Sequence, residues 1–349
     1  MKKYKVLLIG GEGYVGCVIK NFFIANNFYV ESLDGLLYKN CDSVVSNYSL
    51  NYKFIHGYLS EFNENFNPNK FDLIILLAGL VGDPVVRKYK KLSQFINYEQ
   101  IQNVILNLIK KYKNSFFFIS TCSNYGLMNY QDRADENYKL NPISEYSKAK
   151  VAAEKLILNS VNKTKMSPTI FRFATAFGAS PRMRFDLTLN EFILNIYNDN
   201  PIEVYDPDTW RPYCHVIDFA NILYQSFMSK ISLRKFQVYN AGFNKNHTTK
   251  RQLVYLITNL LGKNLDNVKF INSSGNDARN YKVNFNKISK LVGNRPMFDI
   301  KKGILQLKHL MDNKIYEDFG KELKKGNYII DHKKSKLLTT LHQQQSQRQ

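Results

Sequence analysis

The sequence is poor in cysteine, histidine and tryptophan, and it holds far fewer acidic than basic residues. Its 349 residues include 4 cysteines, 6 histidines and 1 tryptophan. The cysteines at positions 17, 41, 122 and 214 show neither paired spacing nor a metal-binding pattern. This excludes a disulfide framework and a zinc site, and it indicates a reducing compartment. The histidines are scattered, so we expect no bound metal.

Long apolar runs and internal repeats are also missing. The start of the chain predicts neither a signal peptide nor a membrane span, and we expect a cytoplasmic protein. The net charge is +20, from 49 Lys and Arg against 29 Asp and Glu, and the surplus is spread along the chain. A spread surplus argues against a nucleic-acid-binding arm. It suits an anionic small substrate such as a nucleotide diphosphate, although a Lys-rich and Asn-rich composition explains it equally well.

A glycine-rich turn lies near the start of the chain. A short apolar run over residues 4–9 predicts a buried strand, and a helical pattern covers residues 15–25. Between them, Gly10 permits a tight turn, Gly13 lets the backbone approach a pyrophosphate, and Gly16 lets the helix pack on the sheet. This spacing between a strand and a helix is typical of a dinucleotide-binding turn.

An acidic residue, Asp34, ends the second predicted strand at residues 28–33. A carboxylate at this place accepts hydrogen bonds from the adenosine ribose and repels a 2′-phosphate. No arginine is close in sequence to reverse that preference. The pattern therefore predicts NAD rather than NADP.

Strands and helices alternate over about the first 170 residues. Further strands are predicted at 52–56, 73–77, 115–120 and 166–173, with helices at 94–112 and from a Ser144 cap to about 161. This alternation predicts an α/β fold, a Rossmann-type doubly wound parallel sheet. We expect an NAD-binding domain at 1–178 that carries the catalytic helix. A smaller C-terminal substrate-binding lobe should cover 179–330, with some segments returning to the main domain, and a flexible tail 331–349.

A tyrosine and a lysine lie four residues apart on that second helix. Tyr146 and Lys150 therefore share one helix face, and the ammonium favours ionisation of the phenol. The pair predicts a general base for a sugar or alcohol hydroxyl. A chance pair on a solvated face is the alternative.

Five motifs then occur in one order: the glycine turn, Asp34, Thr121 after the fifth strand, the Tyr146–Lys150 pair, and Arg211 before His215 and Asp218. On these motifs the chain resembles, over residues 4–310, the extended short-chain dehydrogenase/reductases that act on nucleotide sugars, the epimerase/dehydratase group. The segments STCSNYG, FGASPRMRFDL and WRPYCHVID resemble a subgroup of nucleotide-sugar epimerases. Some relatives of that subgroup modify sugars for surface polysaccharides.

The resemblance implies roles for single residues. Tyr146 is expected to be the base, Lys150 to hold the nicotinamide ribose, and Thr121 to hydrogen-bond the reacting oxygen. NAD should lie against Gly10, Gly13, Tyr14, Val15, Gly16, Asp34, Leu59, Ala78, Gly79, Asn97 and Lys150. The nucleotide sugar should contact Cys122, Ser123, Thr175, Arg182, Arg184, Asn190, Arg211 and Arg279. A guanidinium such as that of Arg211 suits the nucleotide phosphates; for Arg182, Arg184, Asn190 and Arg279 a surface or structural role is equally open.

Two departures from the family pattern bear on the reaction. The 4,6-dehydratases of the group carry an acidic pair after the threonine, where this chain has Cys122 and Ser123. A dehydratase is therefore disfavoured. Many relatives have an adenine-contacting aspartate where this chain has Tyr58, so that contact is left to the backbone of Leu59.

The sequence thus predicts an NAD-dependent nucleotide-sugar epimerase or C4 dehydrogenase. A 4-ketoreductase on the same scaffold and a non-catalytic dinucleotide sensor are the alternatives. The resemblance also implies a homodimer, built through helices 94–112 and 144–162. We expect their outer faces to present Ile101, Ile105, Leu108, Leu156 and Ile157.

Overall fold

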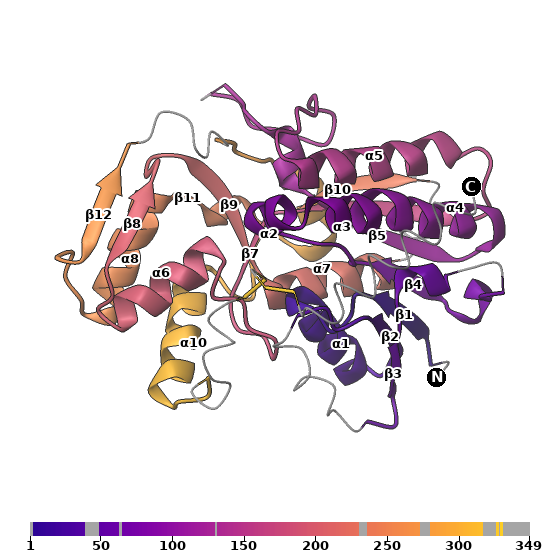
Figure 1. The fold of residues 1–349 in the computed structure, drawn as a ribbon, viewed down its shortest axis with the longest axis horizontal. Helices are drawn as coiled ribbons and strands as arrows, with labels where there is room; N and C mark the ends of the chain where they lie inside the picture. The colour runs from indigo at the N-terminus through magenta and orange to yellow at the C-terminus, as the bar shows by residue number, and fades with distance from the viewer. Residues whose placement is uncertain are drawn as a thin grey trace.

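The computed structural model describes residues 3–38, 49–62, 65–129, 131–229, 236–272, 280–316, 326–327 and 329–330. A seven-stranded sheet forms its centre, in the order β10-β6-β5-β4-β1-β2-β3, and all its strand pairs are parallel. Helices cover both faces of this sheet (Figure 1). The predicted fold class, a doubly wound Rossmann-type sheet, is confirmed.

Apolar runs form the inner strands because both of their faces are covered. In β1, for example, Val6, Leu7, Leu8 and Ile9 are all buried. The strands of the large sheet are β1 (Lys5–Ile9), β2 (Tyr29–Asp34), β3 (Tyr52–His56), β4 (Leu73–Leu76), β5 (Ser115–Thr121), β6 (Ser167–Phe173) and β10 (Gln237–Ala241). The ends of strands β1 to β6 lie within one residue of the predicted ends.

One face of the sheet carries helices α1 (Tyr14–Ala25) and α7 (Val216–Met228), which pack on each other. The opposite face carries α4 (Ile101–Lys111) and α5 (Glu145–Ser160), which form a second pair (Figure 1). Ser144 caps α5, as predicted, because its hydroxyl accepts the backbone N–H of Ser147 at 3.2 Å.

The helical region before β5 starts earlier than predicted. It runs through α2 (Asp83–Lys88), α3 (Lys90–Ser93) and a π-helical segment, Gln94–Gln100, before α4 begins. A π-helical segment is rare, and such segments are frequent at functional sites. Asn97 lies within it.

The prediction that five apolar residues lie exposed on the outer faces of α4 and α5 is wrong. Ile101, Ile105, Leu108 and Ile157 are fully buried in the chain's own core, and Leu156 is half-buried against it. These side chains pack on the sheet because α4 and α5 turn their apolar stripes inward. The exposed leucines on these helices are Leu106 and Leu158, at 41% and 52% exposure.

A smaller lobe lies beyond the carboxyl ends of the main strands, on the left of Figure 1. It contains β7 (Thr175–Phe177), α6 (Thr188–Tyr197), β8 (Ile202–Tyr205), β9 (Trp210–His215), β11 (His247–Thr249), α8 (Lys250–Leu261), β12 (Val268–Ile271) and α10 (Ile300–Asp312). Between these segments the chain returns to the main domain, where α7 covers the sheet, β10 joins its edge and α9 (Asn286–Val292) packs on both. The expected tail, 331–349, lies outside the described residues.

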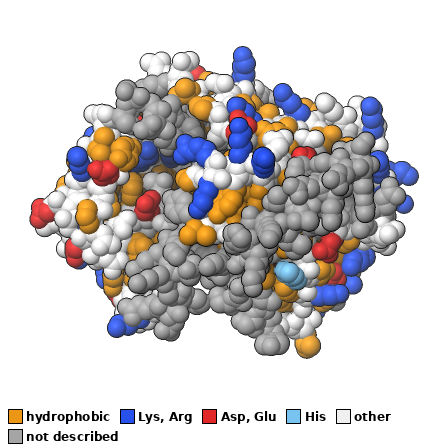
Figure 2. Space-filling model, in the orientation of Figure 1, with side chains coloured by type: hydrophobic (Ala, Val, Ile, Leu, Met, Phe, Trp, Pro, Cys, Tyr) orange, Lys and Arg blue, Asp and Glu red, His pale blue; other side chains and the backbone are white. Residues whose placement is uncertain are grey.

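Two general features of the described part of the chain complete the picture. None of its helices is both long enough and apolar enough to cross a bilayer. Lysine and arginine side chains are dispersed over the face shown in Figure 2, with several near its centre.

Candidate active site

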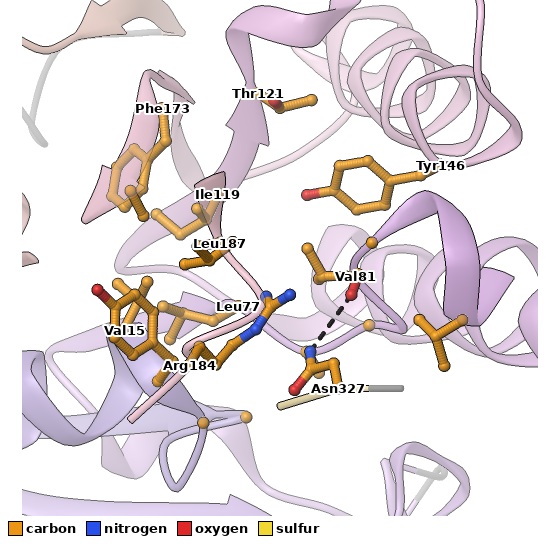
Figure 3. Close-up of a pocket in the computed structure, with 18 of the residues that line it drawn as sticks. Val15, Leu77, Val81, Ile119, Thr121, Tyr146, Phe173, Arg184, Leu187 and Asn327 are labelled. Atoms are coloured by element: carbon orange, nitrogen blue, oxygen red, sulfur yellow. Dashed lines mark hydrogen bonds between the residues drawn. The ribbon is translucent and has the colours of Figure 1, made fainter. Parts of the chain in front are cut away.

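A cavity of about 810 Å³ lies between the carboxyl ends of the main strands and the smaller lobe. It includes the point where the strand order reverses, between β1 and β4, which is where open α/β sheets bind their ligands. Its size suits a cofactor together with a substrate. Figure 3 shows Tyr146 and Thr121 on one side of it and Arg184 reaching in from the other.

The glycine turn has the backbone geometry that a diphosphate needs. Gly10 has φ +87°, which disfavours other residues, and a Cβ there would lie 2.7 Å from the Ala78 backbone nitrogen. A Cβ on Gly16 would lie 2.5 Å from the Gly10 carbonyl oxygen. Gly10, Gly13, Tyr14, Val15 and Gly16 all line the cavity at the N-terminus of α1. Side chains would fill this cradle, so the residues present fit a dinucleotide diphosphate.

A buried ion pair lies next to this turn. Glu12 accepts a hydrogen bond from Lys20 Nζ at 2.6 Å and another from the Tyr52 hydroxyl at 2.9 Å. Glu12 and Lys20 are fully buried, and the Lys20 ammonium also lies 4.6 Å from the centre of the Tyr52 ring. The contacts join the turn, α1 and β3, and the sequence analysis did not anticipate them.

Asp34 lines the cavity at the end of β2. Its carboxylate accepts the backbone N–H groups of Glu12 at 3.0 Å and Leu36 at 2.9 Å, which ties it to the glycine turn. Burial raises the pKa of this carboxyl, while the backbone hydrogen bonds and Arg182 oppose the rise. No arginine lies close to Asp34 in the sequence, but the fold brings Arg182 near it from the smaller lobe.

The loop after β4 forms the opposite side of the cofactor region. Ala78 and Gly79 line the cavity, as does Leu59 after β3. Asn97 does not line it. Its amide oxygen accepts the backbone N–H of Leu80 at 2.8 Å, and its amide nitrogen donates to the Leu80 carbonyl at 3.0 Å. Asn97 therefore positions this loop, and the expectation of direct cofactor contact is corrected.

Tyr146, Lys150 and Thr121 meet at the cavity wall. Tyr146 points its hydroxyl into the cavity in Figure 3, and Thr121 comes from the end of β5. The Lys150 ammonium donates to the Ile119 carbonyl at 2.8 Å and lies 5.8 Å from the centre of the Tyr146 ring. Burial lowers the pKa of Lys150 to about 8, against a smaller opposing effect of Glu154. The three residues could remove a proton from a hydroxyl held beside them.

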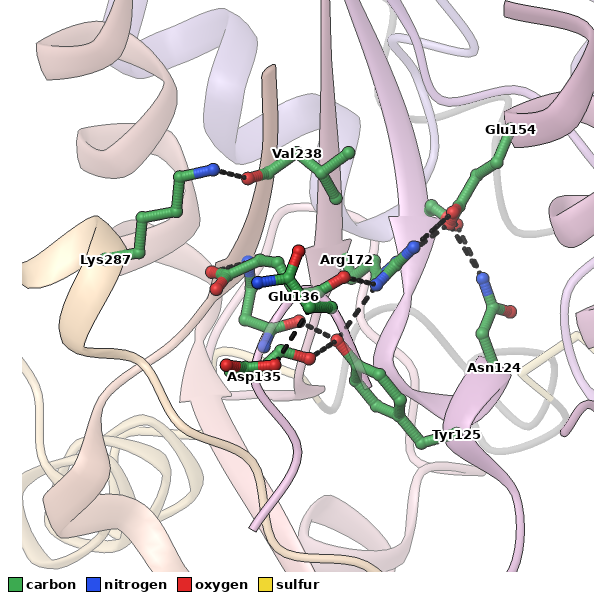
Figure 4. A network of polar contacts seen from close by, with 11 residues as sticks. Asn124, Tyr125, Asp135, Glu136, Glu154, Arg172, Val238 and Lys287 are labelled. Carbon is green, nitrogen blue, oxygen red and sulfur yellow. Dashed lines mark hydrogen bonds and ion pairs between the residues drawn. The ribbon is translucent and has the colours of Figure 1, made fainter. Parts of the chain in front are cut away.

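A buried polar network supports this corner from behind (Figure 4). Arg172 on β6 binds Glu154 on α5 through Nε and Nη2, the latter at 2.8 Å. Glu154 also accepts hydrogen bonds from Ser120 and from Asn124, the latter at 2.8 Å. The network joins the end of β5 to α5, so it fixes Thr121 relative to Tyr146.

Several residues expected to bind the nucleotide sugar line the cavity: Ser123, Thr175, Arg182, Arg184 and Arg211. The Arg184 guanidinium donates to Asp186 at 3.0 Å through Nε. Burial opposes ionisation of Asp186, but Arg184 outweighs it, and the pKa of the carboxyl is lowered. The Arg211 guanidinium lies 5.0 Å from the centre of the Tyr281 ring.

Two other expected side chains point away from the cavity. The Cys122 thiol is buried in the core and donates to the Arg172 carbonyl, so its expected substrate contact is wrong. Asn190 is buried too, and its amide binds the Tyr14 hydroxyl, the Gly178 N–H and the Arg184 carbonyl. It holds α1 to the smaller lobe, which corrects its assignment. Arg279 lies outside the described residues.

The sequence analysis missed several cavity residues, among them Tyr213, Lys250, Tyr281 and Asn327. Tyr281 lies with its hydroxyl 3.4 Å from Ser123 Oγ, beside Thr121. Tyr213 lies within the segment WRPYCHVID but was given no role. No motif marks the other three positions, because these later segments reach the cavity only through tertiary structure. Within the described ranges, no group of three or more potential metal ligands occurs.

The fold and the site together define a dinucleotide-dependent enzyme of the short-chain dehydrogenase/reductase type. A model of the NAD dependent epimerase/dehydratase family matches residues 6–242, and the chain belongs to this family.

Known relatives agree with this assignment. A putative UDP-glucose 4-epimerase from Methanocaldococcus jannaschii is 24% identical, over 88% of this chain and 98% of its own. The fold resembles a UDP-glucuronic acid 4-epimerase from Bacillus cereus, solved with UDP-glucuronic acid and NAD. That structure has TM-score 0.76 and 18% identity, over 88% of this chain and 99% of the other. It also resembles a dTDP-glucose 4,6-dehydratase from Streptomyces venezuelae, solved with NAD, with TM-score 0.79 and 18% identity over 92% and 100%.

Proposed function

We propose that the protein is an NAD-dependent nucleotide-sugar epimerase or C4 dehydrogenase. One observation carries the proposal: Tyr146, Lys150 and Thr121 share a cavity wall between the glycine turn and a group of arginines. The proposed base, the glycine turn that would hold NAD and the arginines that would bind a diphosphate thus all border the same cavity. Held by the glycine turn and Lys150, NAD would supply a hydride acceptor for the sugar carbon, and in an epimerase its reduced form would supply that hydride to the other face of the carbon.

The chain's own residues perform the proton chemistry in this proposal. Tyr146 removes the proton from a ring hydroxyl, most simply at C4, and the buried Lys150 ammonium favours the phenolate. Thr121 holds the reacting oxygen. Arg184 and Arg211 supply positive charge for the nucleotide diphosphate of the sugar.

The alternatives differ in what they need from the site. A 4-ketoreductase uses the same residues with hydride moving the other way. A dinucleotide sensor would need only the cofactor-binding half of the cavity. It would not need Tyr146, Lys150 and Thr121 together at the cavity wall. A 4,6-dehydratase is disfavoured because the thiol of Cys122 is buried and Ser123 is a hydroxyl, where water removal uses acidic residues.

The wider setting belongs to the same proposal. We propose a cytoplasmic enzyme, since no disulfide joins the described cysteines, Cys17, Cys122 and Cys214. Its product would be a sugar for surface polysaccharide synthesis, and its working form a homodimer. These three points rest on the resemblance and on composition.

The test is Tyr146→Phe, which keeps the ring and removes its ionisable oxygen. Turnover of a panel of UDP- and dTDP-sugars should fall by about 10²–10⁴-fold, while NAD affinity stays unchanged. NADH absorbance and product stereochemistry by NMR give the readout. If NADH accumulates together with the product, the enzyme is a dehydrogenase. If product forms without any accumulation of NADH, the enzyme is an epimerase.

Tyr255→Phe is the matched control, because Tyr255 is exposed on α8 and does not line the cavity. It should leave turnover unchanged. Equal turnover by wild type and Tyr146→Phe would exclude this base, and no turnover of any sugar would favour the sensor.

A further inference from the structure

The last described residues of the chain return to the cofactor half of the cavity. Asn327 is 5% exposed and lines the cavity. Ile330 is 3% exposed and packs in a cluster with Leu36 and Leu80. This short segment, of which residues 326–327 and 329–330 are described, therefore belongs to the cofactor site, although neither the family match nor the motifs assign it there.

Asn327 links two loops through its side-chain amide. Its oxygen accepts a hydrogen bond from Arg182 Nη2 at 2.7 Å. Its nitrogen donates to the Val81 carbonyl at 3.3 Å, the contact marked by the dashed line in Figure 3. The Arg182 guanidinium in turn lies 4.6 Å from the centre of the Tyr38 ring. We call Tyr38, Arg182, Asn327 and Val81 together the clasp.

The strand order places the clasp across the glycine turn. β1 lies between β4 and β2 in the sheet, so the loop after β1 lies between the loops after β4 and β2. Tyr38 follows β2, and Val81 follows β4. A chain of contacts from Tyr38 through Arg182 and Asn327 to Val81 must therefore pass over the end of β1, where the diphosphate cradle lies.

The segment is also anchored at its far end. Ile330 forms an antiparallel bridge with Tyr38, and its backbone N–H donates to the Tyr89 hydroxyl at 3.4 Å. At the near end, Gly326 lies so close to Asp186, the partner of Arg184, that a Cβ at this position would clash with its carboxylate. The smaller lobe, the segment and both loops are thus joined around one opening.

We propose that the clasp closes over the diphosphate of bound NAD and must open for NAD to enter or leave. Asn327 is then a residue that keeps the cofactor in place, and Arg182 serves the cofactor and not the sugar. The inference rests on the NAD dependence of the family and deepens the proposed function. An epimerase regenerates NAD in place and gains from retaining it, whereas a dehydrogenase must release NADH.

The experiment measures NAD exchange in wild type and in Asn327→Leu, without any sugar present. Leucine has a similar size and removes both hydrogen bonds, one of them from a charged donor, so dissociation should quicken by about tenfold or more. Association should quicken as well, because a clasp that no longer closes no longer obstructs entry. Stopped-flow binding and displacement of labelled NAD give the two rates separately.

Asn198→Leu makes the same substitution at an exposed residue whose amide binds only its own helix, and both rates should stay at the wild-type value. Ile330→Ala is a milder change at the anchor and should move both rates in the same direction if Asn327→Leu fails to fold. If NAD association and dissociation rates in both Asn327→Leu and Ile330→Ala equal those of the wild type, the proposal that the clasp closes over NAD is refuted. A faster dissociation with unchanged association also overturns it, because Asn327 would then be an ordinary contact. Neither result depends on which sugar is turned over, so the proposed reaction is tested separately.

Discussion

The ionisation of the Lys150 ammonium affects the proposed chemistry, because that charge favours the phenolate of Tyr146. An exposed lysine keeps its proton to about pH 10.4, but burial lowers the pKa of Lys150 to about 8. The active form needs a charged Lys150 beside an ionised Tyr146. We therefore expect kcat/KM to fall as the pH rises above about 8, measured as a pH–rate profile.

Lys148 offers the control, because it is exposed and paired with Glu145 on the same helix. Lys148→Met should leave the falling limb in place, and Lys150→Arg should move it to higher pH, since arginine stays charged. If the fall in kcat/KM stays near pH 8 in Lys150→Arg, the ionisation of another group must cause it.

Sequence patterns located single residues at the cavity where backbone geometry alone determines their position. The glycines at 10, 13 and 16 and the Tyr146–Lys150 spacing follow from turn geometry and helix periodicity. Cys122 and Asn190 could not be assigned in this way. Whether a side chain after a strand points into a cavity or a core depends on packing with segments far away in the sequence.

At the scale of elements, the contact between α5 and β6 depends on a buried ion pair. Glu154 and Arg172 have side-chain exposures of 6% and 7%. Glu154→Gln leaves the guanidinium without its counter-charge, and breaking a buried pair in this way costs about 3–5 kcal/mol. We expect a loss of that size in the free energy of unfolding by urea.

The exposed pair Lys308–Asp312 on α10 gives the comparison, because solvent screens it and Asp312→Asn should leave the urea midpoint almost unchanged. Equal costs at the two sites would show that the buried pair contributes nothing beyond a surface contact.

Strand bounds were predictable because buried parallel strands are short, continuous apolar runs. The helical region before β5 was harder. Its first part, from Asp83, is broken at Tyr89 and passes through a π-helical segment, so no single period of 3.6 residues covers it.

For the whole molecule, we expect a homodimer through α4 and α5. Leu106 and Leu158 are the exposed leucines there, at 41% and 52% exposure. Leu106→Glu should convert the dimer to a monomer, because two carboxylates would be buried in the interface. Light scattering at micromolar concentration gives the mass. Leu50→Glu, at a fully exposed leucine outside these helices, should leave it unchanged. A monomeric wild-type protein would refute the dimer.

Sequence reasoning predicted the large sheet but not the return of residues 326–327 and 329–330 to the cavity. That segment is too short to show a hydrophobic periodicity, and only tertiary contacts bring the segment to the glycine turn. Long-range arrangement of this kind is decided by packing and not by local preference.

The clasp also has a consequence for the order in which the protein becomes competent during synthesis. Arg182 and Asn327 are 145 residues apart in the chain. At about 5–20 residues per second, the ribosome adds Asn327 roughly 7–30 seconds after Arg182. The glycine turn, Asp34 and the catalytic pair are by then already made. A nascent chain should therefore bind NAD loosely at first and retain it only after the segment that carries Asn327 has been translated.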